Sequence, residues 1–327
     1  MNAVKEAPDY LHDEHLSQGT KTYLNVLNGG GPAVESLPVP DARRVLADLQ
    51  AAVPVDLSGV EESERTIESE GRTLRLNLVR PEGTGRERLP VFVFVHGGGW
   101  VLGDYPTHRR LVHDLVAESG CAAGFVNYTP SPEARFPQAV EEIYIAVKWV
   151  AENGREIGVD GSRLALAGNS VGGNMSPAAL LAKDHGGPQI RTLVLMWPVT
   201  DAGYDWDSYA EYGRQRFLTA PLMKWMFEQY VSDPAQRGSD LMSPVRASAE
   251  RLRGLPPTLI AVAENDILRD EGEKMGRLLD AAGVEVTTVR FNGVIHDWGM
   301  LNGFAGLHPT RTLVRLAGAV LRDYLRE

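Results

Sequence analysis

One stretch of the sequence places a single serine between a strand and a helix. It reads Leu164-Ala-Leu-Ala-Gly-Asn-Ser-Val-Gly-Gly-Asn174, and a helical pattern follows over Met175–Ala182. Its glycines lack a Cβ atom where a sharp turn crowds its neighbours. The hydroxyl of Ser170 is therefore expected above the edge of a sheet and at the start of a helix, where negative charge is stabilised. An ordinary turn can have the same composition, so this interpretation depends on partners elsewhere in the chain.

Apolar runs and helical patterns alternate along the rest of the chain. The runs predict strands at Val91–Val95, Ala122–Tyr128, Leu164–Ala167, Leu193–Trp197, Thr258–Ala263 and Val284–Phe291. Helices are predicted from Pro106, over Pro137–Val150, over Asp270–Ala282 and over Arg311–Leu325. Runs that are apolar on both faces are typical of parallel strands covered by helices on each side. With an antiparallel edge pair at Thr66–Ser69 and Thr73–Arg80, the sequence predicts an α/β fold with a mostly parallel central sheet.

Two parts of the chain fall outside this alternation. Residues 1–64 carry two short helical patterns, one with Leu16 on its apolar face and one after Pro40, followed by a polar, strand-poor connection. Residues 201–244 contain eight aromatic side chains and no clear strand pattern. We predict N-terminal cap helices in the first part and a cap insertion in the second, although these aromatic residues could simply pack the insertion onto the body. Residues 65–200 and 245–327 then form the two parts of the main α/β domain.

Charge and cysteine content limit the partners and the compartment. The 327 residues have a formal net charge of −10, which argues against nucleic acid or an anionic membrane as a partner. The single cysteine, Cys121, excludes an internal disulfide framework. The start of the chain is polar and unlike a signal peptide, and no apolar run approaches the roughly 20 residues that span a membrane. We expect a cytoplasmic protein without a membrane anchor.

Three consecutive glycines follow the predicted strand Val91–Val95. In His96-Gly-Gly-Gly-Trp100, backbone N–H groups can point into open space beside a ligand. Fixed donors of this kind stabilise a developing oxyanion, and the loss of one costs roughly 3–4 kcal/mol in acyl transfer. The alternative is a flexible glycine loop, but the combination with the serine turn favours an oxyanion-binding loop. His96 itself is interpreted as a buried residue that holds this loop.

A nucleophilic serine requires a base, and the base requires an acid that orients it. Three histidines follow Ser170 in the sequence. His185 lies in a polar helix end, and His308 leads into the last helix. His296 lies in a turn just after the last predicted strand and is therefore the candidate base.

The acid is expected between the serine and the histidine in the sequence. Asp266 comes just after the predicted strand Thr258–Ala263, so its carboxylate can lie beside His296 if neighbouring strands carry the two residues. Asp201, just after another strand, is the main alternative.

Three further carboxylates are interpreted differently. Asp270 and Glu271 are predicted as charges in the first turn of a helix, where they suit the helix dipole. Asp297 adjoins His296, and adjacent residues rarely orient each other's rings.

Four stretches together carry a family resemblance. They are His96-Gly-Gly-Gly-Trp100, Tyr128-Thr-Pro-Ser-Pro-Glu-Ala-Arg-Phe-Pro137, Gly168-Asn-Ser-Val-Gly-Gly173, and Glu264-Asn-Asp-Ile-Leu-Arg-Asp-Glu-Gly272 with Gly293-Val-Ile-His296. The chain resembles the hormone-sensitive-lipase group of α/β hydrolases, the bacterial family IV esterases. The resemblance implies Ser170 as nucleophile, His296 as base and Asp266 as its acid. It also implies an oxyanion hole formed by the N–H groups of Gly98, Gly99 and Val171.

The resemblance also implies an activity and an assembly. The expected protein is a serine carboxylesterase for small to medium acyl esters, with no cofactor and no metal, whose cap combines residues 1–64 with the insertion. An acyltransferase or amidase with the same triad, or a non-catalytic receptor on the same fold, remain alternatives. Homodimers through the last strand and helix are common in the group. One departure is Asn169, where the group often has aspartate, so a charge is missing beside the nucleophile.

Overall fold

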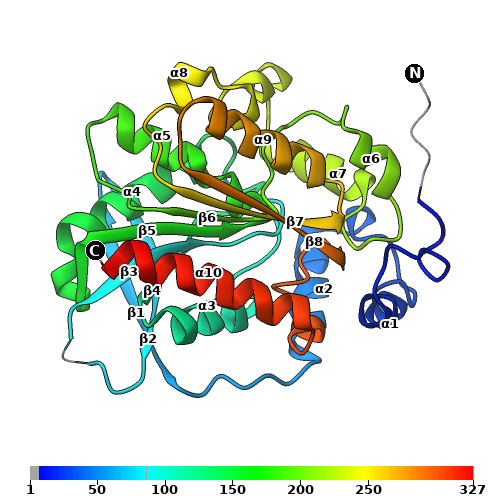
Figure 1. The fold of residues 1–327 in the computed structure, drawn as a ribbon, viewed down its shortest axis with the longest axis horizontal. Coiled ribbons are helices and arrows are strands. Elements are labelled where there is room, and N and C mark those ends of the chain that lie inside the picture. Colours follow the sequence, from blue (N-terminus) through cyan, green and yellow to red (C-terminus); the bar gives the residue numbers. More distant parts are fainter. Residues whose placement is uncertain (1–6, 86, 327) are drawn as a thin grey trace.

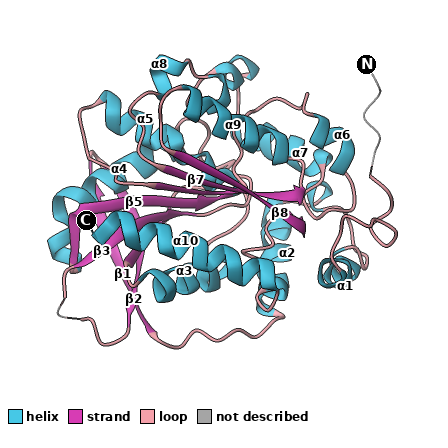
Figure 2. Cartoon of the chain, in the orientation of Figure 1, coloured by secondary structure: helices cyan, strands magenta, loops and turns pink. Residues whose placement is uncertain are grey.

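The computed structural model of the protein describes residues 7–85 and 87–326. In these ranges eight strands form one sheet in the order β1-β2-β4-β3-β5-β6-β7-β8 (Figure 1, Figure 2). Strands β3 to β8 run parallel, whereas β2 pairs antiparallel with both β1 and β4. The strands are β1 (Val60–Ser69), β2 (Arg72–Pro81), β3 (Leu89–Val95), β4 (Ala122–Asn127), β5 (Val159–Asn169), β6 (Leu193–Met196), β7 (Thr258–Asn265) and β8 (Val286–Ile295). The predicted mostly parallel sheet is confirmed.

Helices cover both faces of this sheet (Figure 1). Helices α3 (Tyr105–Ser119) and α10 (His308–Arg326) pack against each other on one face. Helices α4 (Gln138–Asn153), α5 (Ser176–Asp184) and α9 (Arg269–Ala281) lie on the other. Because helices shield it on both sides, β3 is buried at every residue. This burial explains the continuous apolar run by which the strand is predicted.

The remaining helices are short or lie outside the layers. They are α1 (Gln18–Leu27), α2 (Val39–Ala51), α6 (Asp207–Tyr212), α7 (Ala220–Tyr230) and α8 (Ala249–Leu252), with the 3-10 helices η1 (Val34–Ser36), η2 (Gly154–Ile157), η3 (Ser170–Met175), η4 (Pro234–Gly238), η5 (Pro244–Arg246) and η6 (Asn302–Phe304). No helix in the described ranges combines the length and the apolar character needed to cross a bilayer.

The N-terminal helices and the insertion lie together beyond the carboxyl ends of the parallel strands, at the right of Figure 1. A fully buried ion pair joins the two segments, with 2.7 Å between the Arg216 guanidinium and the Asp13 carboxylate. The carbonyl oxygen of Gly293, near the end of β8, accepts hydrogen bonds from the backbone N–H of Ser17 and from the hydroxyl of Thr20. This packing supports the proposed cap, although residues 1–6 of its N-terminal part lie outside the described ranges.

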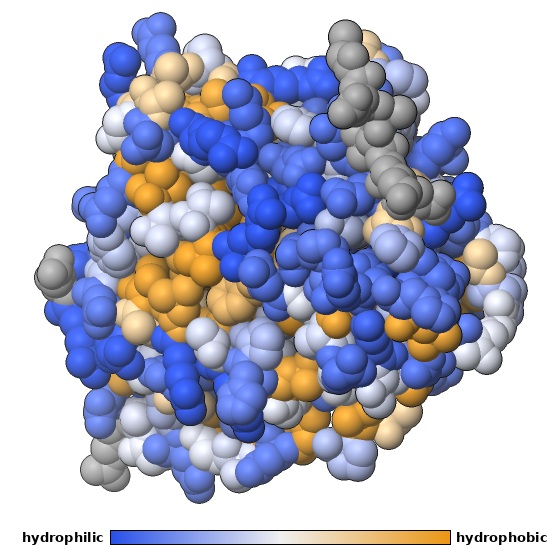
Figure 3. All heavy atoms as spheres, turned by 45° about the vertical axis from the view of Figure 1, so that its right-hand side comes forward, coloured by the Kyte–Doolittle hydropathy of each residue, from blue (hydrophilic) through white to orange (hydrophobic). Residues whose placement is uncertain are grey.

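Figure 3 turns this end of the molecule toward the viewer. On this face, hydrophilic residues separate several apolar patches from one another. Leu11, Val26 and Val45 are large apolar side chains that are more than one third exposed. All three belong to the N-terminal segment or to the cap helices α1 and α2.

Several boundaries of the sequence prediction are wrong, and strands β5 (Val159–Asn169) and β8 (Val286–Ile295) extend beyond their predicted ranges. Strand β1 begins at Val60 rather than at Thr66, so the expected connection already contains half of a strand. Its backbone pairs with β2 along its whole length, but only Ile67 is buried. An exposed edge strand that is held by backbone hydrogen bonds leaves no apolar signal. Leu16 lies outside α1 and instead forms an isolated bridge with Gly293.

Candidate active site

The serine turn has the backbone expected from its glycines. Ser170 follows β5 directly and has a φ of +55°, in the left-handed region. The chain then passes so close to β3 that a Cβ atom on Gly172 would collide with the carbonyl oxygen of Val95. Only glycine fits there, because backbone atoms cannot move aside as a flexible side chain can. The predicted strand, turn and helix are therefore present.

Ser170, His296 and Asp266 form one hydrogen-bonded chain. The Oγ of Ser170 lies 3.0 Å from Nε2 of His296, and Nδ1 of His296 lies 2.7 Å from Oδ2 of Asp266. All three side chains are buried, with exposed fractions of 4% or less. The second carboxylate oxygen of Asp266 accepts the backbone N–H of Leu268. The residues follow β5, β8 and β7, whose carboxyl ends meet at one edge of the sheet.

The other candidates for base and acid lie elsewhere. Asp201 accepts hydrogen bonds from Nε of Arg246 at 2.8 Å and from the indole N–H of Trp206 at 3.1 Å. His185 packs beside the ring of Tyr144, and His308 is the first residue of α10. The structure thus brings His296 together with Asp266 and not with Asp201.

The glycine loop lies against the serine turn. Gly98 and Gly99 have φ values of +102° and +64°, and both line the same cavity as Ser170. The carbonyl oxygen of Gly98 accepts the N–H groups of Val101 and Leu102, which folds the loop back on itself. Val171, the third predicted donor, follows Ser170 at the start of η3 with its side chain fully buried.

His96 is confirmed as a buried residue behind the glycine loop. Its ring stacks on Phe125 and Tyr128, with centroid distances of 5.2 and 4.2 Å. Burial lowers the pKa of His96 to about 4, so the ring is neutral near pH 7. Its Nδ1 lies 2.8 Å from the carbonyl oxygen of Gly97, and the Asn169 side chain accepts the Gly97 N–H at 3.0 Å. These contacts hold the start of the loop.

Asp297, which was predicted only not to orient the ring of His296, is a buried carboxylate beside that ring. Oδ1 of Asp297 accepts hydrogen bonds from the indole N–H of Trp197 at 2.7 Å and from the amide of Asn169 at 3.1 Å. Its Oδ2 lies 3.9 Å from Nε2 of His296. Burial raises the pKa of Asp297 despite these donors. The sequence feature that could have indicated this contact is Asn169. Its amide can donate a hydrogen bond to the carboxylate of Asp297, which an aspartate at position 169 would repel.

Glu271 lies in the first turn of α9 as predicted, but its side chain is fully buried and makes contacts that the sequence did not indicate. Its Oε1 accepts the backbone N–H groups of Thr200 at 2.6 Å and Asp201 at 3.1 Å. Burial raises the pKa of Glu271 well above its usual value. The side chain thus ties α9 to the loop after β6, next to the element that carries Asp266.

A small apolar cavity adjoins the triad. Its volume is about 60 Å³, and residues of the glycine loop, the cap and the triad line it. The proposed cap contributes Val34, Ala42, Val45, Leu46, Leu49, Phe217, Leu218, Leu222 and Met226. Helices α2 and α7 both supply side chains and form much of the cavity wall.

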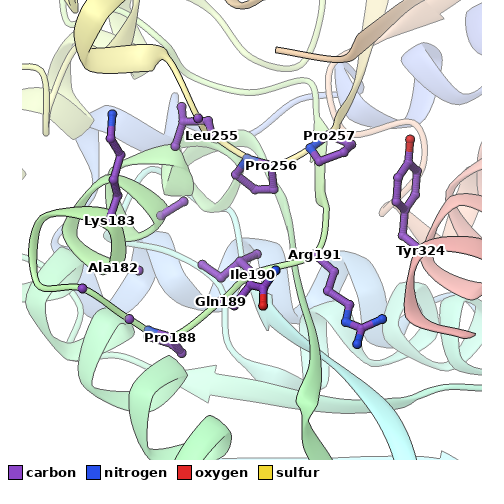
Figure 4. Close-up of a pocket in the computed structure, with 14 residues that line it drawn as sticks. Ala182, Lys183, Pro188, Gln189, Ile190, Arg191, Leu255, Pro256, Pro257 and Tyr324 are labelled. Atoms are coloured by element: carbon purple, nitrogen blue, oxygen red, sulfur yellow. The ribbon is translucent and has the colours of Figure 1, made fainter. Parts of the chain in front are cut away.

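A wider hollow of about 820 Å³ lies away from this site (Figure 4). Pro188, Ile190 and Arg191 from the segment before β6 line it, together with Pro256 and Pro257 before β7. It therefore lies at the amino ends of the parallel strands, opposite the triad.

The chain matches known proteins along most of its length. A family model described as the alpha/beta hydrolase fold matches residues 92–300. An ethyl acetate hydrolase of Pseudomonas putida is 31% identical over 86% of this chain and 92% of its own. The carboxylesterase NlhH of Mycobacterium tuberculosis is 35% identical over 72% of this chain and 74% of its own.

Solved structures agree with these matches. A thermostable esterase from Pseudomonas putida ECU1011 superimposes with a TM-score of 0.94 at 51% identity, over 96% of this chain and 98% of that one. A fungal esterase from Rhizomucor miehei superimposes with a TM-score of 0.89 at 38% identity, over 94% and 96% of the two chains. The chain therefore belongs to the α/β-hydrolase fold family and, within it, to the hormone-sensitive-lipase-like carboxylic ester hydrolases.

Proposed function

We propose that the chain is a serine carboxylesterase that hydrolyses small to medium acyl esters through Ser170, His296 and Asp266. The observation that carries the proposal is the continuous hydrogen-bonded chain from Oγ of Ser170 through the imidazole to Oδ2 of Asp266. This is the arrangement by which a histidine activates a serine hydroxyl.

In the first half of the reaction the ester carbonyl carbon lies against Oγ of Ser170. His296 takes the hydroxyl proton at Nε2 while Oγ attacks, and the carbonyl oxygen becomes an oxyanion. The N–H groups of Gly98, Gly99 and Val171 donate to that oxyanion. Collapse of the intermediate breaks the ester bond, and the alcohol leaves with the proton that His296 returns. Asp266 accepts the Nδ1–H throughout, which fixes the tautomer and stabilises the imidazolium.

The second half repeats these steps with water. His296 removes a proton from a water molecule that attacks the acyl-serine carbonyl, and the same N–H groups hold the second oxyanion. Ser170 leaves with the proton from His296, and the carboxylic acid is released. In both halves of the cycle His296 transfers the proton, and the backbone N–H groups of the glycine loop and Val171 stabilise the oxyanion.

The cavity supports small substrates. A volume of about 60 Å³ is small beside the roughly 300–1,000 Å³ of pockets that hold drug-sized ligands. Its mostly apolar wall favours alkyl over charged groups. The matched ethyl acetate hydrolase supports the same substrate class.

The direct test is hydrolysis of nitrophenyl esters from acetyl to decanoyl, with a rapid-mixing search for the nitrophenol burst that an accumulating acyl-enzyme gives. Turnover that is fastest with short chains supports the proposal. Added alcohol that captures most of the acyl group would favour a transferase, and faster cleavage of anilides than of esters would favour an amidase. Binding of esters without turnover on any chain length would favour a receptor.

Asparagine substitutions separate the two candidate acids. Asp266→Asn keeps the shape of the side chain but removes the acceptor charge at Nδ1 of His296, so we expect kcat to fall by about 10⁴-fold. Asp201→Asn disturbs only the contacts with Arg246 and Trp206, away from His296, and should leave kcat close to that of the unmodified protein. Ester hydrolysis with both folded variants is the measurement. The reverse order of activities would identify Asp201 as the acid.

The acid limb of the pH–rate profile should report His296, because only the neutral imidazole can accept the serine proton. Burial lowers the pKa of His296, but the charges of Asp266 and Asp297 outweigh it and leave this pKa above its usual value. Asp297→Asn removes one of these charges and so lowers the pKa. We therefore expect kcat/KM of Asp297→Asn to persist to lower pH.

The control for this shift is Asp323→Asn, which alters a mostly exposed carboxylate of α10. Its acid limb should coincide with that of the unmodified protein. An acid limb of Asp297→Asn that stays in place, or moves to higher pH, would contradict the assignment of the limb to His296.

We also propose that two copies associate through β8 and α10. Strand β8 is the last strand of the sheet order, and an edge strand offers backbone groups to a second copy. Sedimentation velocity distinguishes one chain from two. The cytoplasmic location stays a prediction from the sequence.

A further inference from the structure

The side chain of Met226 on α7 lines the cavity beside Ser170. Met226 is 4% exposed and packs directly on the backbone of Gly99. A Cβ atom on Gly99 would lie 2.8 Å from Cε of Met226 and would collide with its Sδ and Cγ. Met226, Gly99 and Ser170 line the same cavity. A cap side chain thus covers the loop that the proposed mechanism uses to bind the oxyanion.

Aromatic stacking holds α7 against this loop. The fully buried indole of Trp100, the residue after Gly99, stacks on Tyr230 with centroids 4.1 Å apart and an interplanar angle of 10°. Its ring also packs against that of Phe227, with the two ring centroids 5.4 Å apart. These rings fix the backbone of α7 relative to the glycine loop. Within this fixed frame Met226 is the adaptable part, because its unbranched side chain has three rotatable bonds.

The reacting carbon constrains where the acyl chain goes. Its oxyanion must lie at the N–H groups of Gly98 and Gly99, and its leaving oxygen must lie near Nε2 of His296, which protonates it. The acyl chain takes the remaining direction, into the cavity that Gly99 and Met226 line together with Ser170. Because the space there is small, a chain of more than a few carbon atoms meets the methionine side chain.

We propose that Met226 is the movable end wall of the acyl pocket and determines the length of acyl chain that the enzyme accepts. Short acyl groups fit with the side chain in place. Longer groups require the thioether to leave Gly99, and that lost packing lowers kcat/KM as the chain grows. The inference rests on the proposed esterase function and adds to it a determinant of acyl preference.

The test compares two methionines of the same helix. Met226→Ala removes the end wall, whereas Met223→Ala removes an equal side chain that is equally buried but does not line the cavity. Each variant is assayed with nitrophenyl acetate, butyrate, hexanoate and octanoate. We expect the octanoate-to-acetate ratio of kcat/KM to rise at least about tenfold in Met226→Ala, the size of effect that one methylene has in a hydrophobic pocket. The ratio of Met223→Ala should stay near that of the unmodified protein.

The ratio separates a pocket wall from a packing residue. If Met226 only stabilises α7, its loss lowers the rates for all four esters together, and that result would overturn the inference. An equal rise in Met223→Ala would overturn it too. Met226→Val keeps more of the side chain and should give an octanoate-to-acetate ratio between those of Met226→Ala and the unmodified protein. It replaces Met226→Ala in the test if the alanine variant does not fold. Absence of hydrolysis by the unmodified protein would refute the esterase function instead.

Discussion

Ser170→Ala is expected to lower kcat for ester hydrolysis by about 10⁶-fold while the protein stays folded. The substitution removes the only atom of the proposed triad that bonds to the substrate. Loss of the serine in a triad costs about this factor, and the residual rate comes from substrate binding and the oxyanion donors. The hydroxyl makes one hydrogen bond, to Nε2 of His296, so its removal should change the unfolding midpoint little. The measurement is initial rates with nitrophenyl acetate, beside a thermal unfolding curve.

His296→Ala provides the matched comparison. Because the two residues act as a unit, the double variant should be no slower than either single variant. Multiplicative losses in the double variant would mean that the two side chains act independently. A folded Ser170→Ala protein that retained more than a small fraction of the activity would place the nucleophile elsewhere.

Asp13→Ala is expected to give the largest loss of stability, about 3–5 kcal/mol in the free energy of unfolding of the cap. The carboxylate and the Arg216 guanidinium are 1% and 2% exposed, so truncation leaves a buried cation without its counterion. The same guanidinium also donates to the carbonyl oxygen of Pro8. Urea unfolding gives the global value, and hydrogen exchange over residues 7–17 shows whether the loss is local to the N-terminal segment.

The double variant Asp13→Ala with Arg216→Met tests the cause. Replacing both partners removes the stranded charge, so most of the lost stability should return. Because Phe217, next to Arg216, lines the cavity, Asp13→Ala should also raise KM more than it lowers kcat. Equal stability of the single and double variants would show that packing, and not charge, carries the effect.

The proposed triad was predictable because each of its members lies just after a predicted strand. Strands β5 and β7 contain buried apolar runs, β8 ends in the buried Val294 and Ile295, and parallel strands bring their carboxyl ends to one edge. The serine turn is local too, since its glycines and its backbone strain lie within a few residues. No long-range information was needed to place these groups near each other.

The contacts that the sequence did not indicate join residues that lie far apart in the chain. Glu271 is in the first turn of a helix by sequence, and only the loop after β6, about 70 residues earlier, makes it a buried acceptor. Asp297 gains its position from Trp197, 100 residues away, and from Asn169. The prediction began strand β1 too late, at Thr66, because backbone hydrogen bonds to β2 hold its first half, and these bonds leave no pattern in the side chains. Periodicity describes burial along one element, and these features arise between elements.

The hydrogen bond from Thr20 to Gly293 spans 273 residues, so it can form only after most of the chain has been synthesised. At about 5–20 residues per second the ribosome needs roughly 15–55 s to translate from one partner to the other. During that interval the N-terminal segment has no β8 on which to dock. The helices that it carries therefore wait outside the growing sheet, and the substrate cavity closes only after the last strand has emerged. We therefore expect the N-terminal part of the proposed cap to dock late in folding, after β8 has formed.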